Sequence, residues 1–244
     1  MNLNVTIHNG IANVILDYPP LNILSEKVKE EITQTFQNLA EDRTVRVILF
    51  HSGGDHFCCG ANLKEFPDRI RNKTAREVWV RGHAMLASII NLPQPTIAYV
   101  TGNALGGGAE LASAFDIRVF ASTARVGYPE VLRGVFPGNG GLERLISLVG
   151  EGHAMRLVLT GKPITAEEAY KIGLASEVVS EREGKEYTEE LARYVPPCRV
   201  RLYKPLNRQS ACIQIILLLL MKKERNSSIR FMKPMMYRRL FKLL

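Results

Sequence analysis

The sequence predicts an α/β fold, in which short β-strands alternate with α-helices around a buried sheet. Three observations support this prediction: apolar runs of about five residues, intervening segments with apolar residues at helical spacing, and repeated strand-turn-helix units. With 244 residues, of which 46% are hydrophobic and 23% are charged, the chain has enough apolar material for one large domain with an appendage. We place the domain in residues 1–190, and a C-terminal helical segment with an atypical basic end in residues 191–244.

The first expected elements are a β-hairpin, a helix and a strand. Leu3 to His8 and Ala12 to Leu16 are β-rich runs separated by Asn9-Gly10, a pair that is typical of two-residue hairpin turns. Ser25 is a suitable N-cap for the amphipathic helix that follows, since its hydroxyl accepts from a free backbone N–H of the first turn. Val45 to Phe50 is an apolar run that predicts a buried strand.

The remaining elements continue the alternation. We expect helices at 74–91, 142–149, 150–159 and 165–172, strands at 96–100, 117–120 and 175–179, and a short helix that begins at the glycines 106–108. Six apolar residues of the helix at 74–91 are expected to be buried: Val78, Val80, Met85, Leu86, Ile89 and Ile90.

The stretch 95–141 contains the features from which chemistry is expected. Gly106-Gly107-Gly108 separates a buried strand from a short helix, so the first turn of this helix has free N–H groups and the positive end of the helix dipole. Both favour an anion, or a carbonyl oxygen that becomes negatively charged during a reaction. The glycines alone are equally consistent with a close-packed turn. However, Glu110 follows on the same helix as the one charge between Pro95 and Phe115, and Glu130 comes twenty residues later. Two glutamates near an amide-lined pocket indicate general acid/base catalysis.

This stretch resembles the crotonase family, also called the enoyl-CoA hydratase/isomerase family. An upstream element, Phe57-Cys58-Cys59-Gly60-Ala61-Asn62-Leu63-Lys64-Glu65, resembles it too, and the similarity runs from about Val5 to Val179. The resemblance implies a crotonase-like ββα superhelix with a spiral core, an acyl-CoA thioester as substrate, and assembly as homotrimers that often pair into hexamers.

Residue-by-residue matching to the family assigns an oxyanion hole to the backbone N–H groups of Ala61 and Gly107. A thioester oxygen gains negative charge when its enoyl group is attacked, and two fixed amides stabilise that charge without any side chain. The implied substrate-binding residues are Ala61, Asn62, Leu63, Lys64 and Gly107. Asn62 departs from the family pattern, which has Asp there, and Lys64 is either a contact for the nucleotide of coenzyme A or a solvated surface residue.

The predicted reaction is reversible addition of water to a trans-2-enoyl-CoA, giving a 3-hydroxyacyl-CoA. The resemblance assigns the α-proton to Glu130 and the water to Glu110. No metal is expected, and no cofactor either, because coenzyme A is part of the substrate. The alternative within the family is an enoyl-CoA double-bond isomerase, which needs a single carboxylate; the presence of both glutamates favours hydration.

The formal charge of +8 belongs to the end of the chain. From Arg199 onward there are twelve Lys and Arg residues and one acid, Glu224, a charge of +11, so the first 198 residues carry −3. We consider three interpretations of this end: a divergent helical segment, an end altered by a shifted reading frame, and a basic surface for RNA or membrane lipid. The last gives a function hypothesis of another class, an RNA- or membrane-binding protein.

The sequence also predicts the cellular location of the protein and the redox state of its cysteines. It shows no leader-like start and no run of about 18 apolar residues, so a cytoplasmic location is expected. The four cysteines are then reduced thiols, and Cys58 and Cys59 are expected to be small apolar fillers beside Gly60.

Overall fold

The computed structural model describes residues 2–195, which lie within the first of two compact units of the chain, Met1–Arg199. The predicted domain boundary after residue 190 falls inside the last described helix, α7 (Gly184–Tyr194). The basic end and the three interpretations of it concern residues outside the described part of the chain.

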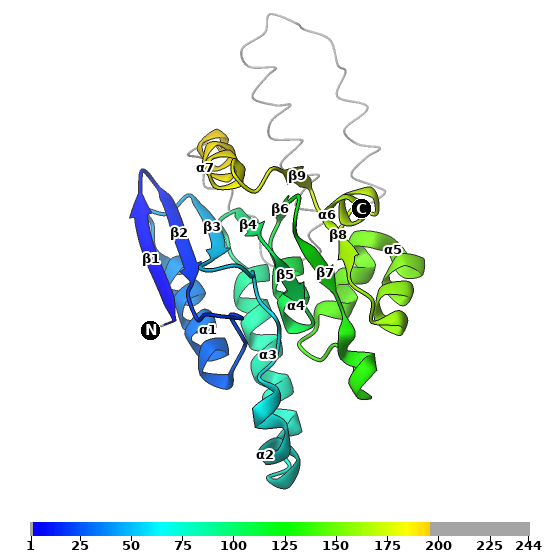
Figure 1. Cartoon of the computed structure of the whole chain (residues 1–244). Helices are drawn as coiled ribbons and strands as arrows, with labels where there is room; N and C mark the ends of the chain where they lie inside the picture. Colours follow the sequence, from blue (N-terminus) through cyan, green and yellow to red (C-terminus); the bar gives the residue numbers. More distant parts are fainter. Residues whose placement is uncertain (1, 196–244) are drawn as a thin grey trace, which may run out of the picture. The chain divides into compact units, whose positions relative to one another are not determined.

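A six-stranded sheet with the order β1-β2-β3-β4-β6-β9 forms the centre of this unit (Figure 1). β1 and β2 are antiparallel, and the other neighbours are parallel. The predicted hairpin is confirmed, because Asn9 and Gly10 have φ values of 51° and 76°, as a two-residue turn of this type requires. The bounds of the strands are β1 Leu3–His8, β2 Ile11–Leu16, β3 Val47–Ser52, β4 Thr96–Val100, β6 Ile117–Ala121 and β9 Glu177–Val179.

Two of the predicted helices begin at capping side chains. Ser25 accepts a hydrogen bond from the N–H of Val28 at 3.2 Å, and Thr165 accepts one from Glu168 at 3.2 Å, so both predicted N-caps are confirmed. The two helices expected at 142–159 form one element with a kink at Gly150, where φ is 75° and ψ is 162°. The bounds are α1 Glu26–Glu41, α2 Phe66–Arg71, α3 Ala75–Ile90, α4 Gly107–Ala114, α5 Gly141–Thr160 and α6 Ala166–Lys171. Within residues 2–195, none of these helices combines the length and apolar character that crossing a bilayer demands.

One burial prediction for α3 is wrong. Val80 is 50% exposed, whereas Met85, Leu86 and Ile89 are buried as expected. Gly82 is also buried, and at 100° per residue Val80 lies on the opposite side of the helix from it. The helix α3 therefore has more apolar residues than its buried face accommodates.

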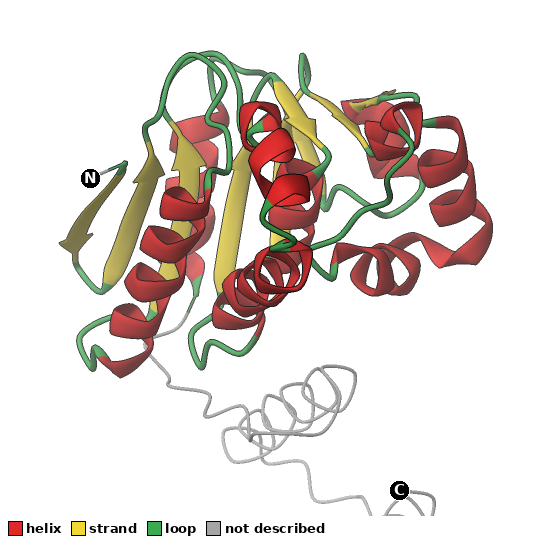
Figure 2. Cartoon of the chain, turned by 90° about the horizontal axis from the view of Figure 1, so that it is seen from below, coloured by secondary structure: helices red, strands yellow, loops and turns green. Residues whose placement is uncertain are grey.

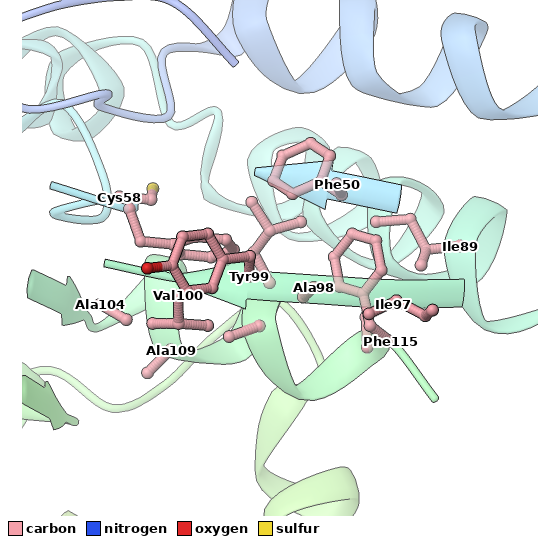
Figure 3. Packing of buried hydrophobic residues seen from close by; sticks show 14 of the residues in the cluster. Phe50, Cys58, Ile89, Ile97, Ala98, Tyr99, Val100, Ala104, Ala109 and Phe115 are labelled. Atoms are coloured by element: carbon pink, nitrogen blue, oxygen red, sulfur yellow. The ribbon is translucent and has the colours of Figure 1, made fainter. Parts of the chain in front are cut away.

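Both faces of the main sheet are covered. On one face, Phe50 of β3 packs against Phe36 of α1 with ring centroids 6.1 Å apart, and against Phe115 at 5.0 Å. Figure 2 shows α1 and α3 along the sheet, and Figure 3 shows Phe50 and Phe115 beside β4. On the other face, the hydroxyl of Tyr99 donates to the carbonyl of Glu181 at 3.1 Å, next to α7, which contacts β3, β4 and β6. The predicted α/β fold is confirmed, and burial on both faces explains why its central strands read as continuous apolar runs.

A second, three-stranded sheet positions the stretch from which chemistry is expected. Its strands, in the order β5-β7-β8, are too short to have been predicted: β5 Asn103–Leu105, β7 Arg125–Gly127 and β8 Ile164–Thr165. β5 and β7 are parallel, with Leu105 opposite Gly127. β5 leads into α4, and β7 leads into a 3₁₀ helix, η2 (Pro129–Arg133). The starts of α4 and η2 therefore lie at the same edge of this sheet.

Candidate active site

The first wall of the site consists of backbone from two segments that are distant in the sequence. The N–H of Cys58 donates to the carbonyl of Asn103 at 3.0 Å, and the N–H of Leu105 donates to the carbonyl of Cys58 at 2.9 Å. The carbonyl of Gly60 accepts from Leu24 at 2.8 Å. The first two bonds tie Cys58 to β5, which leads into α4, and the third holds the Cys59–Ala61 segment that follows Cys58.

Glycine is required in this wall because backbone meets backbone. A Cβ on Gly60, whose φ is 87°, would lie 2.7 Å from the carbonyl oxygen of Leu105, and one on Gly108 would overlap the carbonyl oxygen of Cys58. Two of the three predicted glycines, Gly106 and Gly107, line a pocket together with Gly60 and Ala61. The close-packed turn and the amide-lined pocket, which the sequence left as alternatives, are thus both present.

The pocket brings together four of the seven predicted site residues. It has a volume of about 170 Å³, and Ala61, Leu63, Gly107 and Glu130 are among its lining residues. The backbone N–H groups of Ala61 and Gly107 donate to no protein acceptor within residues 2–195. Other lining residues are Cys59, Gly60, Phe66, Leu105, Gly106, Pro129, Arg133 and Val135.

Glu130 enters the pocket from η2 and comes close to the glycine wall, which consists of Cys59–Ala61 with Gly106 and Gly107. A Cβ on Gly106 would lie only 2.8 Å from its Oε1 atom, so glycine is needed there for the carboxyl group to approach. The Oε2 atom is buried and has no hydrogen-bond partner in the described part of the chain. Burial raises the pKa of Glu130 to about 7; its own backbone N–H opposes the rise, and the charge of Glu110 adds to it.

Unlike Glu130, Glu110 has hydrogen-bond partners for both of its carboxyl oxygens. It is 1% exposed and is not among the residues that line the pocket. Its Oε1 accepts from the backbone N–H groups of Asn139 and Gly141, both at 3.0 Å, and its Oε2 accepts from the amide of Asn139 at 2.5 Å. Burial raises the pKa of Glu110, whereas these three donors oppose the rise because they stabilise the ionised form. The charge of Glu110 reaches Glu130, so the two carboxyl groups belong to one electrostatic environment.

The other predicted substrate-binding residues, Asn62 and Lys64, lie outside the pocket lining. Asn62 caps the 3₁₀ helix η1 (Leu63–Glu65), since its Oδ1 accepts from the N–H of Lys64 at 3.1 Å and its amide donates to Glu65 at 3.1 Å. Lys64 is exposed. The asparagine that departs from the family pattern thus has a structural role in this chain.

Two residues at the site were missed by the sequence analysis. Asn139 supplies two of the three hydrogen bonds to Glu110, although it precedes α5 and follows Glu110 by 29 residues. Arg133 lines the pocket one turn of η2 after Glu130. The signal for Arg133 was its spacing of three residues from a predicted catalytic glutamate, but using that signal required knowing that the segment is a 3₁₀ helix.

Of the two cysteines next to Gly60, Cys58 agrees with the expectation of a small apolar filler. Cys58 is fully buried, and burial raises its pKa to about 12, so its thiol is not ionised at neutral pH. Cys59 is partly buried and lines the pocket, and burial raises its pKa too. Within residues 2–195, no group of three His, Cys, Asp or Glu side chains is arranged to hold a metal ion.

Comparisons with known proteins identify the family of this chain. A model of the enoyl-CoA hydratase/isomerase family matches residues 6–208. A probable enoyl-CoA hydratase of Bacillus subtilis is 36% identical over 174 residues, which cover 71% of this chain and 67% of the relative. The short-chain-enoyl-CoA hydratase of Clostridium acetobutylicum is 36% identical over 208 residues, which cover 83% of this chain and 79% of the relative.

The fold has a similar counterpart among solved structures. The enoyl-CoA hydratase of Bacillus anthracis aligns with a TM-score of 0.79 and 33% identity, covering 92% of this chain and 89% of that one. The chain spans only 60 to 63% of the length of three mammalian mitochondrial relatives, the enoyl-CoA hydratase domain-containing protein 2 of human, cattle and mouse. The predicted crotonase-like fold is confirmed by the structural likeness and the predicted family by the matches, and the chain belongs to the enoyl-CoA hydratase/isomerase family.

Proposed function

We propose that this chain is an enoyl-CoA hydratase, which adds water reversibly to a trans-2-enoyl-CoA to give a 3-hydroxyacyl-CoA. The observation that carries the proposal is the shared pocket: two backbone amides without a protein acceptor and one carboxyl group with a raised pKa line the same small cavity. A thioester carbonyl meets two donors there, and its neighbouring carbons meet a proton source.

In the proposed reaction, the amides of Ala61 and Gly107 donate to the thioester oxygen. Attack of water on C3 shifts the electrons of the C2–C3 double bond toward the thioester, and its oxygen becomes an enolate oxygen. Donors fixed at about 2.7–3.1 Å stabilise that charge by several kcal/mol in a site that excludes water. Because the glycine wall is held by backbone hydrogen bonds, the donors are already in place before the substrate arrives.

The two glutamates divide the proton transfers. Glu110, whose ionised form is stabilised by three N–H donors, takes a proton from water while the hydroxide oxygen bonds to C3; its Oε2 accepts one hydrogen bond and has a lone pair left for that water. Glu130, with a pKa of about 7, is partly protonated at neutral pH and gives its proton to C2. Proton exchange with solvent then restores both groups.

Hydration of crotonyl-CoA tests the proposal, because loss of the conjugated double bond lowers its absorbance. A four-carbon probe suits a pocket of about 170 Å³, and the Clostridium relative is named for short chains. We expect Glu130→Gln and Glu110→Gln each to lower turnover by about 10²–10⁴ with binding of the CoA ester retained. Glu151→Gln, an exposed glutamate on α5, is the matched control. Hydration at the wild-type rate by both site variants would refute the assignment.

A second candidate function is supported by the position of Glu110. Since Glu130 is the acid that lines the pocket and Glu110 is engaged by Asn139 and Gly141, a single carboxylate is in place to move a proton between C2 and C4. This is the isomerase reaction. A 3-enoyl-CoA probe distinguishes the two: an isomerase generates the conjugated absorbance and retains this activity in Glu110→Gln, whereas the proposed hydratase loses its main activity in that variant.

Assembly and location are further parts of the proposal. We propose a homotrimer or a pair of trimers in the cytoplasm, with an acyl-CoA thioester as the molecule bound. Sedimentation of the full chain, compared with a chain that ends at Arg208, tests the assembly. The alternative of an RNA- or membrane-binding protein rests on the basic end, and salt-dependent binding to RNA or to anionic liposomes tests it.

A further inference from the structure

The pocket contains one cation that the proposed reaction does not use. Of its twelve lining residues, Glu130 and Arg133 are the two with charged side chains, and the others are apolar residues, glycines and Cys59. Arg133 forms no ion pair and no side-chain hydrogen bond with any residue of the described part of the chain. A guanidinium group offers five donors and no acceptor, so it has the capacity to bind an anion.

The helix η2 places this cation on the same side as Glu130. A 3₁₀ helix has 3.0 residues per turn, so side chains three residues apart lie one above the other, about 6 Å along the axis. Glu130 and Arg133 are three residues apart in η2. Gly134, with φ of 69°, ends the helix directly afterwards, and Val135 continues the pocket wall.

The guanidinium group does not neutralise the catalytic carboxyl group. An ion pair with Arg133 would lower the pKa of Glu130, but burial and Glu110 hold that pKa near 7, and Arg133 does not contribute to the shift. Arg133 therefore lines the same pocket as Glu130 without neutralising its carboxyl group.

We infer that Arg133 binds a carboxylate at the far end of the acyl chain, so that the substrate class is the enoyl-CoA of a short dicarboxylic acid. This inference rests on the proposed function, because it takes Glu130 to act at C2. One turn of η2 beyond Glu130, Arg133 meets a group that lies a few bonds beyond the double bond, and its planar fork matches a carboxylate with two parallel hydrogen bonds. An uncharged acyl end leaves the guanidinium group, which is exposed, with water as its partner.

The kinetic test compares two substrates that differ in this group alone. Trans-glutaconyl-CoA is crotonyl-CoA with a carboxylate in place of one methyl hydrogen, and both lose the conjugated absorbance on hydration. We expect the wild-type chain to have a kcat/KM for glutaconyl-CoA at least tenfold above that for crotonyl-CoA. In Arg133→Met the ratio of the two values should fall by about 10- to 100-fold, and in Arg133→Lys by less, since charge remains but the fork is lost. Arg182→Met, an exposed arginine before α7, should keep the wild-type ratio.

A binding measurement makes the inference independent of turnover. Glutaryl-CoA and butyryl-CoA are the saturated counterparts, and titration calorimetry gives their Kd values for the full chain. A preference for glutaryl-CoA that disappears in Arg133→Met supports the inference even if neither enoyl-CoA is hydrated, in which case only the proposed function fails. Equal Kd values in the wild type, or an equal loss for both esters in Arg133→Met, would overturn it; the equal loss would assign Arg133 to a phosphate of coenzyme A.

Discussion

The two walls of the pocket are built in opposite ways. The glycine wall, Cys59–Ala61 with Gly106 and Gly107, consists of backbone held by interstrand hydrogen bonds. The η2 wall, Pro129–Val135, consists of side chains on a short helix, and its residues from Val131 to Val135 are exposed. In the proposed reaction, the glycine wall offers two backbone donors to the thioester oxygen, whereas the contribution of the η2 wall depends on its side chains. Under the proposal, backbone of one wall therefore supplies the contacts to the thioester oxygen, whereas side chains of η2 supply the acid, Glu130, and one turn later the contact for the acyl end, Arg133.

The largest predicted effect is the fall in kcat when one hydrogen-bond donor is removed from the glycine wall. Ala61→Pro removes a backbone N–H that has no protein acceptor within the described residues, so the free protein loses no hydrogen bond there. We expect kcat for crotonyl-CoA hydration to fall by about 10²–10³, as for other oxyanion-hole donors. Ala61→Gly keeps the N–H and is the control. A proline variant that melts like the wild type and turns over at its rate would exclude this donor.

The next effect concerns how tightly each wall is packed. Gly60→Ala and Gly134→Ala both place a side chain at positive φ, 87° and 69°, which costs about 1–2 kcal/mol. At Gly60 the new Cβ also meets the carbonyl of Leu105 at 2.7 Å, whereas at Gly134 nothing lies within 4 Å. We expect Gly60→Ala to lower the free energy of unfolding by about 3 kcal/mol or more, and Gly134→Ala by about 1 kcal/mol. Urea unfolding measures both, and equal losses would contradict the difference in packing.

A third prediction uses the ionisation of the two glutamates. In the proposed hydration, the active pair has Glu110 ionised and Glu130 protonated, so kcat/KM should fall about tenfold per pH unit above the pKa of Glu130, which is about 7. An isomerase that uses Glu130 as its single base needs the ionised form, and its kcat/KM should rise through pH 7 and then level off. A profile from pH 5.5 to 9 with crotonyl-CoA, and a second one with a 3-enoyl-CoA, separates these outcomes.

How far the sequence predicts this architecture depends on how local each determinant is. The caps at Ser25 and Thr165 and the turn at Asn9-Gly10 depend on a few neighbouring residues, and all three were predicted. The strands β5, β7 and β8 have two or three residues each, too few to show a period of two.

The residues of the candidate site also differ in how far the sequence predicts them. The motifs allowed Ala61, Gly107 and Glu130 to be named, and the structure brings these three to one pocket. The orientation of Glu110 is decided by Asn139, and its hydrogen bonds arise only when the loop before α5 closes over α4. No local pattern encodes a contact of that kind.

The smallest predicted effect separates the two glutamates by stability rather than by rate. The pKa of Glu130 is raised from 4.5 to about 7, so the folded state binds this proton more tightly than the unfolded state does. The resulting stabilisation is present below pH 4.5 and is lost as the pH rises through about 7. Glu130→Gln is neutral at every pH, so its free energy of unfolding should match that of the wild type near pH 4.5 and exceed it by about 1 kcal/mol at pH 8, a value reduced for solvent screening of a half-buried group. The pKa of Glu110 is raised too, but Glu110→Gln should lose stability, because both carboxyl oxygens accept N–H donors and the NH2 group of glutamine would face one of these donors. Thermal or urea unfolding of both variants at the two pH values measures this, and a Glu130→Gln chain less stable than the wild type at pH 8 would show that the carboxylate has a stabilising partner.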